Sequence, residues 1–241
     1  MRATRWTLAI ALAGWAALAW LVVDMGHPLA QLTMPMSSAW GPANLAAITA
    51  MWAVMMAAMM LPSALPMIST FAAVSAWHGK TPRWLSFVGA YLLVWVGFSV
   101  AATALQWALQ AAGWVDPMIV SRSALLTAVL LVIAGVYQFS DLKNLCLTHC
   151  RSPLGFVMGE WRDGIRGGFV MGLKHGLQCL GCCWALMALL FVGGVMNLAW
   201  IAALSLIVAI EKLAPRGNQL GRWLGGVLLV VGAWRILALA G

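Results

Sequence analysis

Long runs of apolar residues without any charge dominate this chain. No Asp, Glu, Lys or Arg occurs between Asp24 and Lys80, or between Trp84 and Val115. About 20 apolar residues in a helix cross the hydrocarbon core of a bilayer, so such runs predict membrane spans. The segments that fit are residues 6–23, 44–77, 84–111, 123–139, 169–193, 197–212 and 222–239. The pattern predicts an all-α fold over residues 1–241, a single polytopic transmembrane helical bundle of about seven spans.

Two intervals depart from the simple pattern. Residues 44–77 are too long for one straight span and contain Pro62 and Pro66, which predicts one kinked or broken helix. Residues 140–168 form the longest polar interval, with Pro153 and several glycines among charged residues. We expect this interval to be a cytoplasmic connection with one interfacial helical turn.

Composition and charge agree with a membrane protein and set its orientation. Hydrophobic residues make up 63% of the chain, charged residues 8%, and the mean hydropathy is +0.93. A cytoplasmic N-terminus would place eleven of the fourteen basic residues in cytoplasmic loops, as the positive-inside rule requires. With an odd number of spans, the C-terminus then lies outside. The net charge of +8 comes from basic residues spread over several loops rather than gathered on one face. We therefore expect the bilayer as partner and no nucleic acid.

Cysteine and histidine residues form two groups in the middle of the chain. All five cysteines lie between positions 146 and 183. On a helix, His175, Cys179 and Cys182 fall within about 60° of one another. If the helix over 123–139 continues until Pro153, the group at 146, 149 and 150 also shares one face. These two helices are expected to be antiparallel neighbours, so both groups would converge in the cytoplasmic half of the bundle.

A mixture of thiols and imidazoles is a soft to borderline ligand set. It favours Cu(I) or Zn(II) over Mg(II) or Ca(II), and we expect copper first, with zinc as the alternative. The predicted metal ligands are Cys146, His149, Cys150, His175, Cys179, Cys182 and Cys183. Two other interpretations stay open. The cysteines could pack as small apolar residues, or the Cys-x-x-Cys pair at 179 and 182 could act in thiol-disulfide redox chemistry.

Methionines suggest a path toward these thiols. Met51, Met55 and Met59 repeat at i, i+4 and i+8, and Met56 and Met60 form a second pair. A ladder of thioethers could pass Cu(I) between weak sites. The preceding outer loop contains further soft donors at Met25, His27, Met34 and Met36, which could capture copper from outside. The alternative is that methionine simply fills gaps between packed helices.

No Ser/His/Asp arrangement, phosphate-binding glycine loop or pair of carboxylates is evident, so we expect metal handling rather than catalysis. The expected function is Cu(I) transport or delivery through the methionines to a cytoplasmic-side Cys/His site. A metallochaperone or cuproenzyme would be the partner, and the chain could form oligomers. The alternatives are a membrane thiol-disulfide oxidoreductase and an auxiliary subunit of a larger membrane complex.

A family resemblance covers roughly residues 44–214. The positions that carry it are Met55, Met56, Met59, Met60, Pro62, Tyr137, Gln138, Asp141, Lys143, Cys146, His149, Cys150, Arg151, Pro153, Gly172, His175, Gly176, Cys179, Gly181, Cys182, Cys183, Trp184, Leu186, Met187, Gly194, Met196, Asn197, Trp200, Glu211 and Lys212. In these motifs the chain resembles an uncharacterised bacterial family of predicted metal-binding integral membrane proteins. The resemblance implies a multi-pass protein of the bacterial inner membrane that binds a metal. It implies no substrate, reaction or direction of transport.

Overall fold

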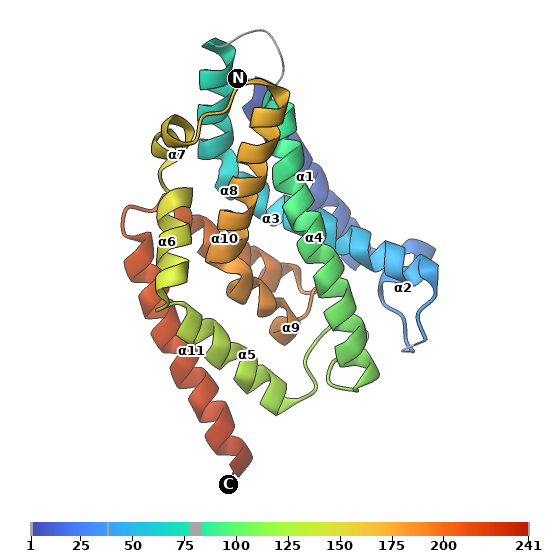
Figure 1. Cartoon of the computed structure of the whole chain (residues 1–241). Helices are drawn as coiled ribbons and strands as arrows, with labels where there is room; N and C mark the ends of the chain where they lie inside the picture. Colours follow the sequence, from blue (N-terminus) through green and yellow to red (C-terminus); the bar gives the residue numbers. More distant parts are fainter. Residues whose placement is uncertain (1, 38, 78–82, 241) are drawn as a thin grey trace.

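Helices account for most of the chain in the computed structural model, which describes residues 2–37, 39–77 and 83–240 (Figure 1). Lys80, which belongs to a predicted cytoplasmic loop, lies outside the described residues. In chain order the helices are α1 (Arg2–Val23), α2 (Pro28–Thr33), α3 (Pro42–Trp77), α4 (Arg83–Ala111), α5 (Ala124–Tyr137), α6 (Asp141–Cys150), α7 (Pro153–Gly159), α8 (Gly164–Ala188), α9 (Leu190–Gly193), α10 (Leu198–Leu213) and α11 (Gly217–Ala240). Within the described residues there is no sheet, so the predicted all-α class is confirmed.

Within the described ranges, fewer than seven helices are long enough to cross a membrane. Five helices are long and apolar enough to cross a membrane: α1, α3, α4, α8 with α9, and α11. The bent pair of α5 and α6 raises the count to six. Helix α5 has 14 residues and α10 has 16, both short of the roughly 20 that a full crossing needs. The count of seven full spans is therefore not supported.

The predicted continuation of the helix over 123–139 toward Pro153 is wrong. Helices α5 and α6 are separate and meet at an angle of 66°. Ser140 causes the break, because its Oγ accepts a hydrogen bond from the Lys143 backbone N–H and caps a new helix. The interval 140–168 is also more ordered than expected, since it contains both α6 and α7.

Helix α3 passes through both of its prolines as one helix of 36 residues. Proline removes a backbone donor, so nearby carbonyl groups need other partners in an apolar environment. Ser63 Oγ donates to the Met60 carbonyl at 3.0 Å, and Thr70 Oγ1 donates to the Pro66 carbonyl at 2.8 Å. The expected kinked or broken helix is thus unbroken over residues 42–77.

Successive long helices alternate in direction through the bundle, and the N- and C-terminal ends lie at opposite ends of it (Figure 1). Helix α8 runs through the middle, packed against α4 and α6, while α11 packs along α5. Glycine allows a close approach of two helices: a Cβ at Gly172 of α8 would lie 2.2 Å from the Phe87 carbonyl oxygen of α4. Small residues at such crossings bring membrane helices into backbone contact. This packing places the cysteine-bearing face of α8 inside the bundle.

Candidate metal centre

Four cysteine thiols from two helices meet at one place; three of these residues are buried and the fourth, Cys150, is half-buried. Cys179, Cys182 and Cys183 of α8 are each 1% exposed. The thiol of Cys150, at the end of α6, interacts with those of Cys179 and Cys182. All are free thiols. We refer to these four residues as the thiol cluster; it joins the two groups that the sequence analysis expected to converge.

Cys179 is the most connected member of the thiol cluster. The ammonium group of Lys212, on α10, donates to Cys179 Sγ at 3.0 Å and to Ser63 Oγ at 3.2 Å. The Tyr91 hydroxyl, on α4, lies 3.1 Å from the same sulfur. A buried cation therefore faces the thiols. Side chains from α3, α4 and α10 surround it together with Cys179 of α8. Charged groups in apolar interiors are costly and commonly mark functional sites.

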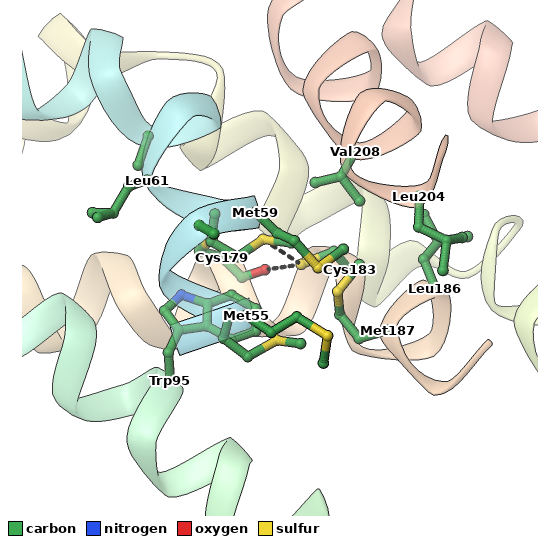
Figure 2. Packing of buried hydrophobic residues seen from close by; sticks show 14 of the residues in the cluster. Met55, Met59, Leu61, Trp95, Cys179, Cys183, Leu186, Met187, Leu204 and Val208 are labelled. Atoms are coloured by element: carbon green, nitrogen blue, oxygen red, sulfur yellow. Dashed lines mark hydrogen bonds between the residues drawn. The ribbon is translucent and has the colours of Figure 1, made fainter. Parts of the chain in front are cut away.

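The other two thiols on α8 point back along their own helix. Cys182 Sγ and Cys183 Sγ each donate to the Cys179 carbonyl oxygen at 3.0 Å. Cys183 Sγ also lies 4.0 Å from the thioether sulfur of Met60. Figure 2 shows this contact region, where side chains of α3, α8 and α10 surround Cys183. A change of side-chain rotamer would release both thiols from this carbonyl.

The remaining predicted ligands on α6 are less well placed. Cys146 Sγ packs against α8, where a Cβ at Gly181 would lie 2.7 Å from it. His149 is exposed, and its Nδ1 interacts with the Leu145 carbonyl at 2.8 Å. The spacing of 146, 149 and 150 therefore does not bring all three side chains to one face toward α8. Cys146 borders the thiol cluster, whereas His149 does not reach it.

His175 lies one helical turn before Cys179 and is 2% exposed. Its ring stacks near Phe87, Tyr91 and Phe156. Among the described residues neither ring nitrogen has a hydrogen-bond partner. Buried polar atoms nearly always have partners, so an unpartnered imidazole beside thiols is available for coordination.

Helix α3 carries a buried column of thioethers that ends at the thiol cluster. Met51 is 4% exposed, and Met55, Met56, Met59 and Met60 are fully buried. We refer to these five residues as the methionine column. Figure 2 shows Met55 and Met59 on α3 beside Cys183 and Met187 of α8. The column thus leads along α3 to the contact between Met60 and Cys183. Buried methionines can also simply fill space between packed helices.

The predicted outer-loop donors lie elsewhere in the fold. His27 caps α2, because its Nδ1 accepts a hydrogen bond from the Leu29 backbone N–H at 3.2 Å. Met34 and Met36 line a cavity beside that helix. These side chains are therefore separate from the thiol cluster.

Three residues at this centre were not predicted from the sequence as part of a site: Tyr91, Lys212 and Ser63. Glu211 and Lys212 at the end of an apolar helix were the available signal, because ionisable residues inside membrane bundles are usually paired and functional. Glu211 accepts from Lys143 Nζ at 2.7 Å and from Gln138 Nε2 at 3.1 Å, and both members of the ion pair are buried. Lys143 also donates to Gln138. Through Glu211 and Lys212, α10 links both cysteine-bearing helices.

Replacing Glu211 by Gln should destabilise the protein by about 1 to 3 kcal/mol, because buried Lys143 would lose its counter-charge. Thermal unfolding in detergent measures the change. Glu160→Gln is the matched control: Glu160 pairs with Lys174 at 2.5 Å on the surface, and this ammonium lowers the pKa of the Glu160 carboxyl. We expect little change there. Equal shifts for the two variants would contradict a structural role of the buried pair.

The depth of the thiol cluster follows from its position on α8. Cys179 lies 15 positions after Gly164, where α8 begins, which is about 22 Å at 1.5 Å per residue. Half-exposed Lys174 is nevertheless only five positions away. The cluster therefore lies near the middle of the helix but within a short distance of a polar surface.

In this conformation no group of three or more His, Cys, Asp or Glu side chains within the described ranges has the geometry of a formed metal site. Comparisons with curated proteins and with solved structures found no match. Comparison with protein families gave one match, to a family described as copper chaperones, and it covers residues 49–235. This range includes the thiol cluster, Lys212 and the whole methionine column. The chain belongs to the PpoB2 copper chaperone family.

Proposed function

We propose that this chain is a membrane copper chaperone that binds Cu(I) as cargo at the thiol cluster. The observation that carries the proposal is the convergence of three buried thiols, the half-buried Cys150 thiol, the Met60 thioether and the Lys212 ammonium at one place. A cytoplasmic metallochaperone or a cuproenzyme under assembly would receive the ion. Zinc fits thiols as well, but the thioether contact and the family description both favour copper.

Charge balance explains why a lysine belongs beside the thiols. Cysteine binds a metal as thiolate, so two thiolates and one Cu(I) carry a net charge of −1. An unbalanced charge is unfavourable in an apolar bundle. The Lys212 ammonium, 3.0 Å from Cys179 Sγ, would neutralise this complex. We therefore assign Lys212 the role of counter-ion to the bound cargo.

The methionine column is the proposed route of the ion. Thioethers are neutral, so they bind Cu(I) more weakly than thiolates and allow stepwise exchange between sites. The column ends where Met60 meets Cys183, which orders the ligands from weaker to tighter along α3. His175, whose ring nitrogens have no hydrogen-bond partner among the described residues, lies one turn from Cys179 toward the start of α8. It would be a further ligand, or the position from which the ion leaves the thiol cluster. This order favours movement from the methionines to the thiols.

For the bundle in the bilayer we propose seven passes of unequal length, with the N-terminus in the cytoplasm. The alternating directions and opposite termini (Figure 1) support an odd number of passes. Two passes would be short, the bent pair α5–α6 and α10. The distribution of basic residues supports the orientation, and the inner membrane of a bacterium is the proposed location.

The thiol-disulfide oxidoreductase alternative has less support. Thiol-disulfide exchange requires a partner sulfur to reach the attacking thiolate. Cys179 and Cys182 are each 1% exposed, and Cys179 is covered by Tyr91 of α4 and Lys212 of α10. An ion can reach such a place more readily than a protein disulfide.

The proposal is tested by loading the detergent-purified full chain with Cu(I) under anaerobic conditions. We expect about one tightly bound copper per chain, with sulfur-dominated coordination in X-ray absorption spectra. Zn(II) loading in parallel tests metal selectivity. Failure to retain stoichiometric copper after removal of excess metal would refute the proposal.

A further inference from the structure

A second group of methionines surrounds a cavity far from the thiol cluster. The cavity has a volume of about 540 Å³ and lies between the segment around α2 and the loop that follows α4. Four of its lining residues are Met25, Met34, Met36 and Met118. Residues 25–36 and residue 118 are far apart in sequence, so only the fold brings these thioethers together.

Three of these methionine side chains are exposed. Met36 is 87% exposed, Met118 45% and Met25 41%. Methionine normally contributes to cores, where its apolar surface is removed from water. Helix packing would suit buried methionines such as those of the column, but it does not explain exposed thioethers gathered around one cavity. Soft-metal binding is a property that methionine offers and leucine does not.

Hydrogen bonds hold both walls of the cavity in place. Gln110 Nε2, at the end of α4, donates to the Pro35 carbonyl at 2.7 Å. Asp116 Oδ1 accepts from the Val120 backbone N–H at 2.9 Å, which fixes the loop that carries Met118. The backbone segments that carry the methionines are thus held in place before any ion arrives, which lowers the entropic cost of binding.

Charge and position also fit a cation that moves inward. Asp116 and Arg122 both line the cavity, so their charges offset and the neutral thioethers determine selectivity. Asn44 Nδ2, near the start of α3, donates to the Leu32 carbonyl at 3.1 Å and ties this helix to the cavity wall. Met51, the first member of the methionine column, lies two turns further along α3.

We propose that this cavity is a second soft-metal site, where Met25, Met34, Met36 and Met118 capture Cu(I) before it enters the methionine column. The inference rests on the proposed function for the identity of the cargo. It extends the sequence-based expectation for the outer loop by adding Met118, and it leaves out His27, which caps α2. A thioether site would take Cu(I) or Ag(I) and reject Zn(II), Mg(II) and Ca(II).

Oxidation footprinting of the full chain in detergent tests the site directly. Ag(I), a redox-stable analogue of Cu(I), is added in nitrate buffer before brief peroxide treatment, and methionine sulfoxide is located by mass spectrometry. At free Ag(I) about ten times Kd, roughly one tenth of the sites stay free, so oxidation of the cavity methionines should slow about tenfold. Met158 on α7 is 73% exposed and away from the cavity, so its oxidation rate should not change.

A variant separates coordination from general shielding. In Met34→Leu/Met36→Leu/Met118→Leu, the apolar volume is kept but three thioethers are lost, so Ag(I) should no longer protect Met25. Met158→Leu should leave that protection intact. Protection of Met25 in the triple variant would overturn the site as assigned.

Thiol alkylation in parallel samples distinguishes this inference from the proposed function. If Ag(I) protects the cavity methionines and the cluster cysteines, both proposals stand. Protection of the cysteines alone overturns the cavity site and leaves the thiol cluster. Protection of the methionines alone supports the cavity site and removes the thiol cluster as the cargo site.

Discussion

Replacing Cys179 by Ser is expected to weaken Cu(I) binding at least about 100-fold, which corresponds to about 2.7 kcal/mol. In metal proteins, loss of a residue that only hydrogen-bonds to a ligand lowers metal affinity by up to about 100-fold. Cys179 is a proposed direct ligand, so its loss should cost at least as much. It is also the member of the thiol cluster that contacts Lys212 and Tyr91. Competition with a colorimetric Cu(I) chelator, under anaerobic conditions, measures the change in Kd.

Cys146→Ser is the matched control for this substitution. Cys146 borders the thiol cluster and is half-buried, whereas Cys179 is inside it. The same atom is exchanged in both variants, so a general effect of sulfur loss would appear in both. We expect a much smaller change for Cys146→Ser. An unchanged Kd for a folded Cys179→Ser protein would show that the thiol cluster does not hold the cargo.

Lys212→Met should weaken Cu(I) binding roughly 10- to 1000-fold. The upper limit is the attraction between two opposite unit charges about 4 Å apart at an effective dielectric constant near 20. This attraction is about 4 kcal/mol, or roughly 1000-fold in Kd. In the wild type the ammonium neutralises the negative complex of Cu(I) with two thiolates. Methionine has a similar length and leaves that complex without a counter-charge.

Lys212→Arg separates charge from shape. Arginine keeps the positive charge, so Cu(I) affinity should fall less than with methionine. Some loss is still expected, because the larger guanidinium group must fit against Ser63. Without copper, Lys212→Met should not lower the unfolding temperature, because it removes a buried charge from an apolar interior. If both variants lose affinity equally, Lys212 acts through packing and the counter-ion role is wrong.

Several features of the fold could be derived from the sequence because they depend on neighbours along the chain. A run of apolar residues forms a helix wherever it enters an apolar environment, so each of the seven predicted segments coincides with helix. Side-chain positions on one helix follow from its period of 3.6 residues. The shared face of Cys179 and Cys182 and the repeat of Met51, Met55 and Met59 were predictable on that basis.

Other features depended on contacts between segments that the sequence places far apart. Ser140 starts a new helix, and the resulting bend brings Cys150 to the thiol cluster while His149 stays exposed. No local pattern specified that angle, because the packing of α6 against α8 stabilises it. The helix predicted over 123–139 is likewise shorter in the fold, where α5 has 14 residues, whereas α10 has the 16 residues that the apolar pattern predicted.

The sequence by itself determined the residue types of the candidate site: thiols, an imidazole and thioethers, concentrated on apolar helices. Only the tertiary structure brought Lys212 and Tyr91 to Cys179 and Met118 to the loop methionines. Ligand chemistry is a property of each side chain and is visible in sequence. The balance of charge around a buried site depends on which helices pack together, because the energy of a buried charge is set by its nearest neighbours in space.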